Sequence, residues 1–327
     1  MVSLGVDVSK AKLHACLRRE ADGKQKTKVV ENNCAGVSAL VDWLARQGVA
    51  PAEVHVVLEA TGVYHEVTAE ALHAKGLRVS IVNPAQAKDF ARGLAVRTKT
   101  DAVDAETLAR FGALVQPPAW TPPAPEVRAL QALLARQQAL SEDLRRERNR
   151  QEKALATTTP AQVFASLDAS LGFLEEALAK LQQEIDDHLD GHPQLKADLD
   201  LLTSIPGVGP QVSRHLLVVL RTHHFQRAEQ LAAYLGVVPI ERQSGTSVLG
   251  RARLSKAGPA RVRATLYMAA VVAIRYNPHV SACYARLLAR GKAKMVALGA
   301  AMRKLVHLCF GVFKTRLPYQ ADYAPAT

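Results

Sequence analysis

The 327-residue sequence contains few cysteines and no long apolar run, and both absences narrow the possible functions. Its cysteines form no C-x-x-C pair and no cluster with histidine; they are Cys16, Cys34, Cys283 and Cys309. This scatter argues against a disulfide framework and against a zinc site. It favours reduced cysteines that fill the core of a cytoplasmic protein.

The most apolar run, residues 266–274, is too short to cross a bilayer. The chain opens directly into a predicted strand and not into a signal peptide. We therefore expect a cytoplasmic protein with no membrane partner. The length allows two domains, and a hydrophobic share of 48% indicates well-packed globular material.

Acidic residues are scarce in the C-terminal part of the chain. Residues 201–327 contain 18 Lys and Arg against 3 Asp and Glu, a net charge of +15, whereas residues 1–200 have a net charge of −3. So basic a segment predicts a polyanionic partner, whose phosphates would make binding depend on salt. A solvated basic surface without a partner is the alternative.

The first 115 residues predict a mixed α/β domain. Three strands with short connections come first, and strands and helices then alternate. This order indicates a ribonuclease-H-like fold, in which the first strand, the fourth strand and a late helix bring acids to one edge. The predicted strands are 2–8, 12–18, 26–32, 54–58 and 78–82, and the predicted helices are 37–46, 64–74, 84–94 and 101–115.

Four carboxylates occupy those positions. Asp7 and Glu59 each end an apolar, β-branched run, while Asp101 and Asp104 are three residues apart on one helix face. Converging carboxylates repel one another unless divalent cations neutralise them, and oxygen ligands suit Mg²⁺ or Mn²⁺. Two such ions about 3.5–4 Å apart can clamp a phosphodiester. Alternatively, each acid caps a helix or lies on a solvated face.

Residues 116–126 are rich in proline, which predicts a semi-rigid, extended linker. Two Leu/Ala/Arg/Glu-rich helices follow, at about 127–155 and 164–189, with charged outer faces. They suggest an antiparallel hairpin, which is either a dimerising coiled coil or an intramolecular spacer.

Residues 202–212 have the form of a helix-hairpin-helix, with Gly207 and Gly209 in the turn. Glycine permits close backbone approach, and the next helix offers free N–H groups to a phosphate. A plain helix connection is the alternative. A short helix is predicted at 226–236, and basic helices are predicted at 260–274 and 280–313.

Between these helices, residues 241–258 predict a loop rich in glycine and serine. Ser244 and Ser247 are its candidate hydroxyls. From spacing alone, passive phosphate binding or a flexible turn is favoured over a nucleophile, because no histidine adjoins Ser244 to activate it. The cations expected to offset phosphate charge are Arg242, Arg251, Arg253 and Lys256.

Seven motifs in order make the chain resemble a family of small insertion-sequence transposases over nearly its whole length. They are GVDVSK, LEATGVY, VNPA, KTDAVDA, SIPGVG, QSGTS and LSKAG. Family members join an N-terminal RuvC-like DEDD domain to a C-terminal domain with a catalytic serine. They are described as recombinases guided by a bridge RNA.

The resemblance implies a domain order of 1–115 (RuvC-like DEDD domain), 116–126 (linker), 127–195 (helical arm) and 196–327 (mostly helical serine transposase domain). It implies that Asp7, Glu59, Asp101 and Asp104 are catalytic and bind Mg²⁺. It also implies that Ser244 attacks a DNA phosphodiester to form a transient phosphoserine bond.

The implied partners are donor DNA, target DNA and a structured guide RNA, with which Lys10 and Lys99 of the first domain are expected to make contact. A dimer that assembles to a tetramer on DNA is expected, in the bacterial cytoplasm and near the nucleoid. Two alternatives remain: a hydrolytic RuvC-like nuclease in which Ser244 only holds phosphate, and a non-catalytic nucleic-acid-binding remnant.

Overall fold

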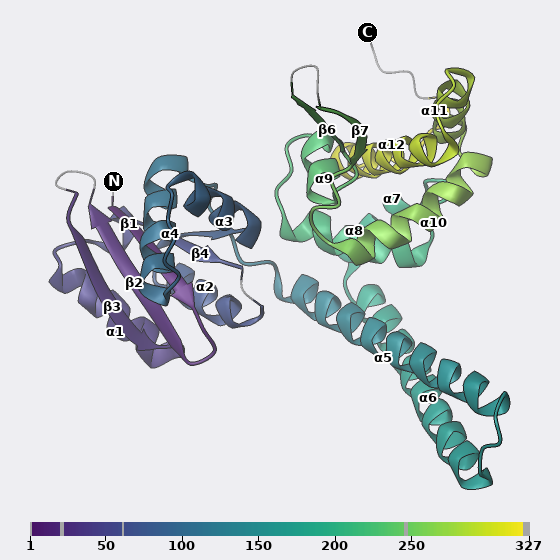
Figure 1. Ribbon diagram of the computed structural model, residues 1–327, viewed down its shortest axis with the longest axis horizontal. Helices are drawn as coiled ribbons and strands as arrows, with labels where there is room; N and C mark the ends of the chain where they lie inside the picture. Colours follow the sequence, from purple (N-terminus) through teal and green to yellow (C-terminus); the bar gives the residue numbers. More distant parts are fainter. Residues whose placement is uncertain (1, 20–22, 61, 245–247, 323–327) are drawn as a thin grey trace. The chain divides into compact units, whose positions relative to one another are not determined.

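The computed structural model describes residues 2–19, 23–60, 62–244 and 248–322 (Figure 1). The side chains of residues 242–251 lie outside the described part. The chain divides into two compact units, Met1–Pro122 and Pro123–Thr327. The finer division into linker, arm and serine domain stays a prediction.

The first unit is a five-stranded mixed sheet with helices on both faces (Figure 1). The strand order is β3-β2-β1-β4-β5, in which β1, β2 and β3 are antiparallel neighbours while β4 and β5 continue parallel to β1. This is the ribonuclease-H-like order that the sequence predicts. The elements are β1 (Val2–Val8), β2 (Lys12–Arg19), β3 (Gln25–Glu31), α1 (Cys34–Arg46), the 3-10 turn Pro51–Glu53, β4 (Val54–Glu59), α2 (Tyr64–Ala74), β5 (Arg78–Val82), α3 (Pro84–Gly93) and α4 (Asp101–Val115).

Alternation along β1 sends its side chains to opposite faces of the sheet. Leu4 and Val6 are fully buried in a cluster with Leu40 of α1 and Leu72 of α2. The other face, that of Gly5, is covered by α4. Asp7 lies two residues after Gly5 on the same strand, so its side chain points to the face that α4 covers.

The proline-rich segment after α4 is fastened to the edge strand β5. The backbone N–H of Trp120 donates to the carbonyl of Val79 at 2.7 Å, and the hydroxyl of Ser80 donates to the carbonyl of Pro118 at 2.8 Å. Ser80 also contacts the buried imidazole of His55 at 2.8 Å. Burial, with the nearby Arg78 charge, lowers the pKa of His55 to about 4, so this side chain is neutral at physiological pH.

The second unit begins with two long helices that run antiparallel. Together they form a hairpin that projects from the rest of the unit (Figure 1). Arg148 pairs with Glu175 at 2.8 Å, and the Gln151 amide donates to Asp168 at 2.7 Å. The elements of this unit are α5 (Pro125–Leu155), α6 (Ala161–Asp190), α7 (Pro193–Thr203), α8 (Pro210–Thr222), α9 (Ala228–Tyr234), β6 (Pro239–Ser244), β7 (Val248–Leu254), α10 (Ala260–Tyr276), α11 (Pro278–Ala289) and α12 (Lys294–Thr315).

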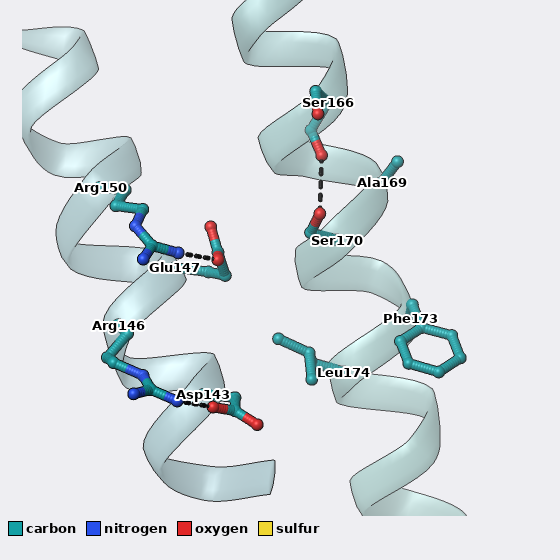
Figure 2. Close-up of a pocket in the computed structure, with 9 residues that line it drawn as sticks. All are labelled: Asp143, Arg146, Glu147, Arg150, Ser166, Ala169, Ser170, Phe173 and Leu174. Carbon is teal, nitrogen blue, oxygen red and sulfur yellow. Dashed lines mark hydrogen bonds and ion pairs between the residues drawn. The ribbon is translucent and has the colours of Figure 1, made fainter.

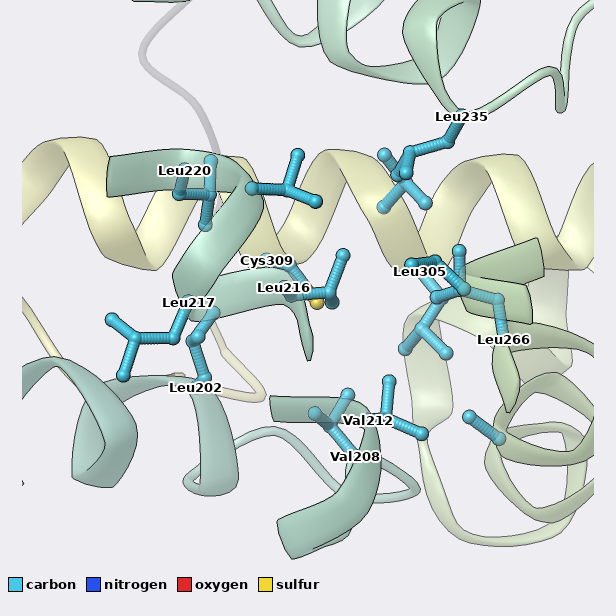
Figure 3. Packing of buried hydrophobic residues seen from close by; sticks show 14 of the residues in the cluster. Leu202, Val208, Val212, Leu216, Leu217, Leu220, Leu235, Leu266, Leu305 and Cys309 are labelled. Atoms are coloured by element: carbon cyan, nitrogen blue, oxygen red, sulfur yellow. The ribbon is translucent and has the colours of Figure 1, made fainter. Parts of the chain in front are cut away.

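One apolar core joins the base of this hairpin to the C-terminal helices (Figure 3). Leu202, Leu216, Leu305 and Cys309 are fully buried in it. Within the described residues, only the helix Lys294–Thr315 is long and apolar enough to span a membrane, and half of its most apolar window is buried inside the protein. A core helix has that property.

Three sequence expectations are wrong in detail. Cys34 is exposed at the start of α1, so the cysteines are not all core residues, although all four are free. The helix expected over 280–313 is two helices, because the chain turns at Gly291, where φ is +72°. The loop expected over 241–258 contains the antiparallel pair β6 and β7.

Candidate active site

Asp7 and Glu59 lie side by side at the carboxyl end of two parallel strands. Val6 of β1 is paired with Leu58 of β4, so the next residue on each strand is one of the two acids. Both side chains are partly buried. The sheet register therefore brings together two acids that are far apart in the sequence.

Asp101 and Asp104 come from the first turn of α4, which packs on the same face of the sheet. The hydroxyl of Thr100 accepts a hydrogen bond from the backbone N–H of Val103 at 3.3 Å and caps the helix. Carboxylates in a first turn interact favourably with the helix dipole, which partly offsets their repulsion from Asp7. The cap and the dipole thus hold two acids at this helix end.

Two glycines allow α4 to lie close to β1. A Cβ on Gly5 would come within 2.0 Å of the carbonyl oxygen of Ala105, and a Cβ on Gly112 would come within 2.3 Å of the Ser3 hydroxyl. At position 5 the clash is with helix backbone, so only glycine fits there, whereas a side chain at position 112 would require Ser3 and Val57 to shift. Gly5 is two residues from Asp7, and this close contact sets the distance between Asp7 and the acidic end of α4.

The pKa of Asp7 reflects the acids around it. This pKa is raised from its ordinary 3.8 to about 6, mainly by burial and then by the charges of Asp101, Asp104 and Glu59 in that order. His14 acts in the opposite direction. All four predicted acids therefore belong to one electrostatic group.

The other candidate residues of the first unit are exposed lysines. Lys10 lies in the turn between β1 and β2, two residues beyond the end of β1. Lys99 precedes the Thr100 cap of α4. Both lie within three residues of a predicted acid along the chain, where a cation can meet a phosphate.

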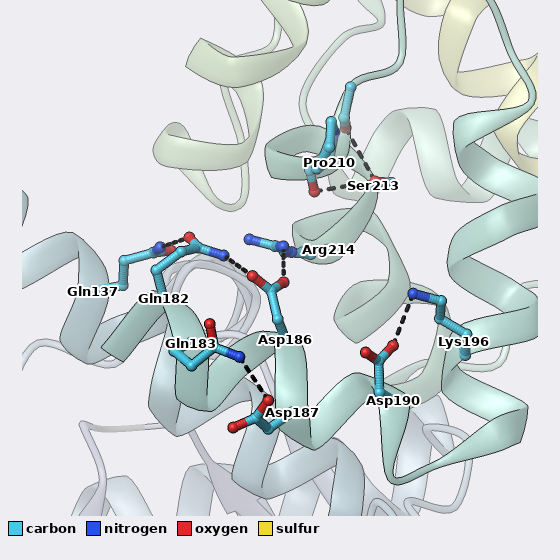
Figure 4. A network of polar contacts seen from close by, with 11 residues as sticks. Gln137, Gln182, Gln183, Asp186, Asp187, Asp190, Lys196, Pro210, Ser213 and Arg214 are labelled. Carbon is cyan, nitrogen blue, oxygen red and sulfur yellow. Dashed lines mark hydrogen bonds and ion pairs between the residues drawn. The ribbon is translucent and has the colours of Figure 1, made fainter. Parts of the chain in front are cut away.

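In the second unit, the turn between α7 and α8 contains Gly207 and Gly209. Gly207 has a φ of +96°, and a Cβ there would lie 2.6 Å from the Ala273 Cβ, so the turn requires glycine for packing. Ser213 of α8 donates to the carbonyl of Pro210 at 3.0 Å (Figure 4). A helix-turn-helix connection is present at this place, but binding of a phosphate by it stays a prediction.

Beside that turn, a polar network joins the hairpin to α8 (Figure 4). Arg214 pairs with Asp186, whose other oxygen accepts from the Gln182 amide at 2.8 Å. Gln182 in turn accepts from Gln137 at 2.6 Å. This chain of contacts fixes the base of the hairpin against the C-terminal helices.

Ser244 is the last residue of β6 and is paired with Val248, the first residue of β7. Residues 245–247, which include Ser247, lie outside the described residues, as do the side chains of Arg242, Ser244 and Arg251. Arg253 and Lys256 are described and exposed. The backbone thus places Ser244 at the tip of a two-stranded hairpin.

A cavity of about 730 Å³ between α5 and α6 contains none of the predicted site residues (Figure 2). Ion pairs within one turn of α5 line it, Asp143 with Arg146 and Glu147 with Arg150. Phe173 of α6 is 67% exposed beside them. These self-paired charges leave the cavity with no net charge excess.

Comparison with known proteins decides the family. Residues 4–160 match a family of transposases with a DEDD domain, and residues 199–285 match the transposase IS116/IS110/IS902 family. A pilin gene-inverting protein of Moraxella lacunata is 33% identical over 319 residues, which cover 97% of each chain. The chain belongs to the IS110 family of transposases.

A pilin gene-inverting protein of Moraxella bovis is 32% identical over the same length and coverage. A solved structure of Thermus thermophilus RuvC in complex with a Holliday junction substrate is 18% identical; the match covers 35% of this chain and 96% of that chain, with a TM-score of 0.27. The transposase is thus an enzyme that cuts and transfers DNA strands.

The donor set of the transposase fits a hard divalent cation. Four carboxylates offer only oxygen ligands, and the pKa of Asp7 is raised by burial and by the three neighbouring negative charges, both of which a bound cation would offset. Within the described residues, however, no three His, Cys, Asp or Glu side chains lie close enough to hold a metal ion as they stand. The chemistry of the four acids therefore fits Mg²⁺, whereas the described side-chain positions do not form a closed set of ligands.

His14 contacts the candidate acids and was not predicted from the sequence. It lies directly opposite Asp7 in the antiparallel pair of β1 and β2, and its Nε2 is 3.2 Å from a carboxylate oxygen of Asp101. Asp101 is 58% exposed and is held toward β2 by this contact. The available signal was the register of the β1–β2 hairpin. Asp7 and His14 are directly opposite in it, and opposite residues of an antiparallel pair point to the same face of the sheet.

Proposed function

We propose that this transposase breaks and rejoins DNA through a covalent bond to Ser244, with Asp7, Glu59, Asp101 and Asp104 binding Mg²⁺. The observation that carries the proposal is the gathering of four acids around Asp7, in a member of a transposase family. The strand register of Asp7 and Glu59 and the close packing of α4 on Gly5 support this proposal over a separate solvated or capping role for each acid.

In the covalent step, the Ser244 hydroxyl oxygen forms a bond to phosphorus while the bond from phosphorus to one strand oxygen breaks. Ser244 loses its proton, and the departing strand oxygen gains one. The number of phosphate ester bonds is unchanged, so rejoining in the reverse direction needs no ATP. Of the described cations, Arg253 lies opposite Ile240 at the base of the hairpin and Lys256 lies two residues beyond β7, so we assign them to contacts with the nucleic-acid backbone away from the reacting phosphate.

The residues of the first unit hold the cation and orient it. Mg²⁺, when bound, supplies a Lewis acid for phosphate oxygens. Asp7 and Glu59 provide fixed ligands from the sheet, while Asp101 and Asp104 are on the helix end. Asp101 would be a further ligand, and its contact with His14 at 3.2 Å orients this carboxylate in the absence of a cation.

We further propose that the basic C-terminal part binds donor DNA, target DNA and a structured guide RNA. The net charge of +15 over residues 201–327 supports a polyanionic partner, and the family resemblance supports the guide. Base pairing with the guide would then select the sequence, as in other RNA-guided systems. Dimerisation through the hairpin of α5 and α6, and a tetramer on DNA, belong to the same proposal.

Strand cleavage by matched variants tests the assignment. Ser244→Ala and Asp101→Ala should each abolish cleavage while retaining DNA and RNA binding, whereas Ser247→Ala should keep measurable activity. Circular dichroism confirms that each variant is folded. Robust cleavage by Ser244→Ala, together with loss of cleavage in Asp101→Ala, would favour the hydrolytic nuclease. Normal activity of Asp101→Ala would refute the metal site.

A further inference from the structure

A cavity of about 620 Å³ lies in the second unit, where the end of α8 meets the end of α12. Its volume is within the range of small-molecule sites, about 300–1,000 Å³. Basic and aromatic side chains dominate its lining, and neither Ser244 nor any of the four acids is among them. The lining residues are Leu220, Arg221, His223, His224, Phe225, Gln226, Phe310, Phe313, Lys314 and Arg316.

The cations of this cavity outnumber the acids that pair with them. Arg221 donates through Nε to Asp198 at 2.6 Å, and Arg316 binds the other oxygen of the same carboxylate. Asp198 is 1% exposed, whereas Arg316 is 52% exposed. Lys314 donates to the carbonyl of Gln226 at 3.2 Å, and the described residues show no acid paired with it. One buried carboxylate thus fixes two arginines and leaves an excess of positive charge.

The same cations are arranged over aromatic rings. The Arg221 and Arg316 guanidinium groups lie 6.0 and 5.1 Å from the centre of the Phe313 ring, and Lys314 lies 5.6 Å from that of Phe310. At the rim, the rings of His223 and Phe225 are stacked, with centroids 5.7 Å apart and planes 16° from parallel. Oriented planar groups and a net positive charge, to which Lys314 contributes without an acidic partner among the described residues, are therefore present in one cavity.

We propose that this cavity captures one unpaired nucleobase of a single strand, together with a neighbouring phosphate. Proteins that bind single strands stack bases on aromatic rings and guanidinium planes and hold the backbone with cations. The cavity supplies both features in one place. A base inside a duplex is already stacked on its neighbours and presents no free face, so the site selects unpaired positions.

The site rests on the proposed function, since it gives the nucleic acid of that proposal a specific contact. Its position at the junction of α8 and α12 links it to the α7–α8 turn through a single helix. A captured base would hold a strand in register on the C-terminal unit. DNA and RNA strands share the chemistry that the cavity recognises, and the test separates them.

The experiment uses the full chain in EDTA with a fluorescent oligonucleotide whose residues are abasic except for one 2-aminopurine. Stacking quenches 2-aminopurine, and anisotropy of an end label gives the affinity. We expect quenching, and affinity about 5- to 150-fold higher than for the fully abasic strand, since stacking of one base has that effect. Deoxyribose and ribose strands are compared, and the tighter one identifies the source of the base.

Phe313→Leu keeps an apolar side chain but removes the ring, so it should abolish both the quenching and the affinity difference. Lys314→Gln should weaken the binding of both the deoxyribose and the ribose strand. It should also reduce the slope of log affinity against log salt concentration by about one. Its matched control is Lys294→Gln, which removes an exposed lysine at the other end of the same helix and should leave affinity within about twofold. If Phe313→Leu does not fold, the pair of lysine variants decides.

If the wild-type protein binds the 2-aminopurine strand and the fully abasic strand with equal affinity, and 2-aminopurine is not quenched, the proposal is overturned. Equal losses in Lys314→Gln and Lys294→Gln would also overturn it, because they would show a general charge effect. No strand cleavage enters the assay. Failure of the serine mechanism therefore leaves its outcome unchanged, and failure here leaves the serine mechanism untouched.

Discussion

Asp7→Asn should stabilise the metal-free transposase at neutral pH. The carboxyl of Asp7 has its pKa raised from 3.8 to about 6, so the folded state holds this proton more tightly than the unfolded state does. Between these two pKa values the unfolded state binds fewer protons, and stability falls as pH rises. The loss is complete above about pH 6 and absent below 3.8.

The size of this effect follows from the pKa difference. A change from 3.8 to about 6 corresponds to about 3 kcal/mol at neutral pH. Asp7 is partly exposed, and water screens part of the interaction, so we expect about 2 kcal/mol from Asp7→Asn at pH 7.5. At pH 3.5 the variant and the wild type should be equally stable.

Calorimetry of the full chain in EDTA at both pH values measures the difference. Asp42→Asn is the matched control, because it removes an exposed carboxylate from α1 of the same unit and should change little. Added Mg²⁺ should stabilise the wild type and lose most of that effect in Asp7→Asn. A variant that is no more stable than the wild type at pH 7.5 without metal would refute the electrostatic account of the site.

Three further predictions concern the same architecture. Gly5→Ala should destabilise the fold by about 1–3 kcal/mol, because its Cβ would clash with the Ala105 carbonyl, and it should lower cleavage because α4 is displaced. Thermal unfolding and cleavage assays measure the two effects, and unchanged values would contradict the packing argument. His14→Ala should change Mg²⁺ affinity by several-fold in titration calorimetry because it frees Asp101, with His14→Gln closer to wild type; identical affinities would remove His14 from the site. The purified protein should carry RNA, and its affinity for DNA should fall steeply between 50 and 200 mM salt, as expected for several phosphate contacts; a flat response would contradict the basic interface.

Much of the first unit could be predicted from the sequence because its signals are local. Apolar β-branched runs marked β1 and β4, and the spacing of Asp101 and Asp104 marked the first turn of α4. The convergence of the acids followed from the order of strands and helices. Contacts set by tertiary packing were not predictable in the same way: the role of Gly5 depends on Ala105, which lies 100 residues later.

The second unit shows where local signals mislead. Glycine and serine in residues 241–258 indicate a loop, yet pairing between Ser244 and Val248 makes a hairpin, because strand pairing depends on partners across a turn. The cavity near Phe313 was also missed, since its residues come from two segments about 90 positions apart and share no sequence motif. The break between α11 and α12 had a local signal, Gly291, that the prediction of one helix over 280–313 did not use.

The bond between Ser244 and DNA is the central claim, and trapping it is the most direct test. A suicide DNA substrate with a nick near the cleavage position releases a short fragment and leaves the protein attached to the strand. Protease digestion and peptide mass mapping then identify the attached side chain. The account predicts an adduct on Ser244, formed in Mg²⁺ and absent in Asp101→Ala. An adduct on Ser247, or efficient cleavage by the wild type with no protein attached, would contradict it.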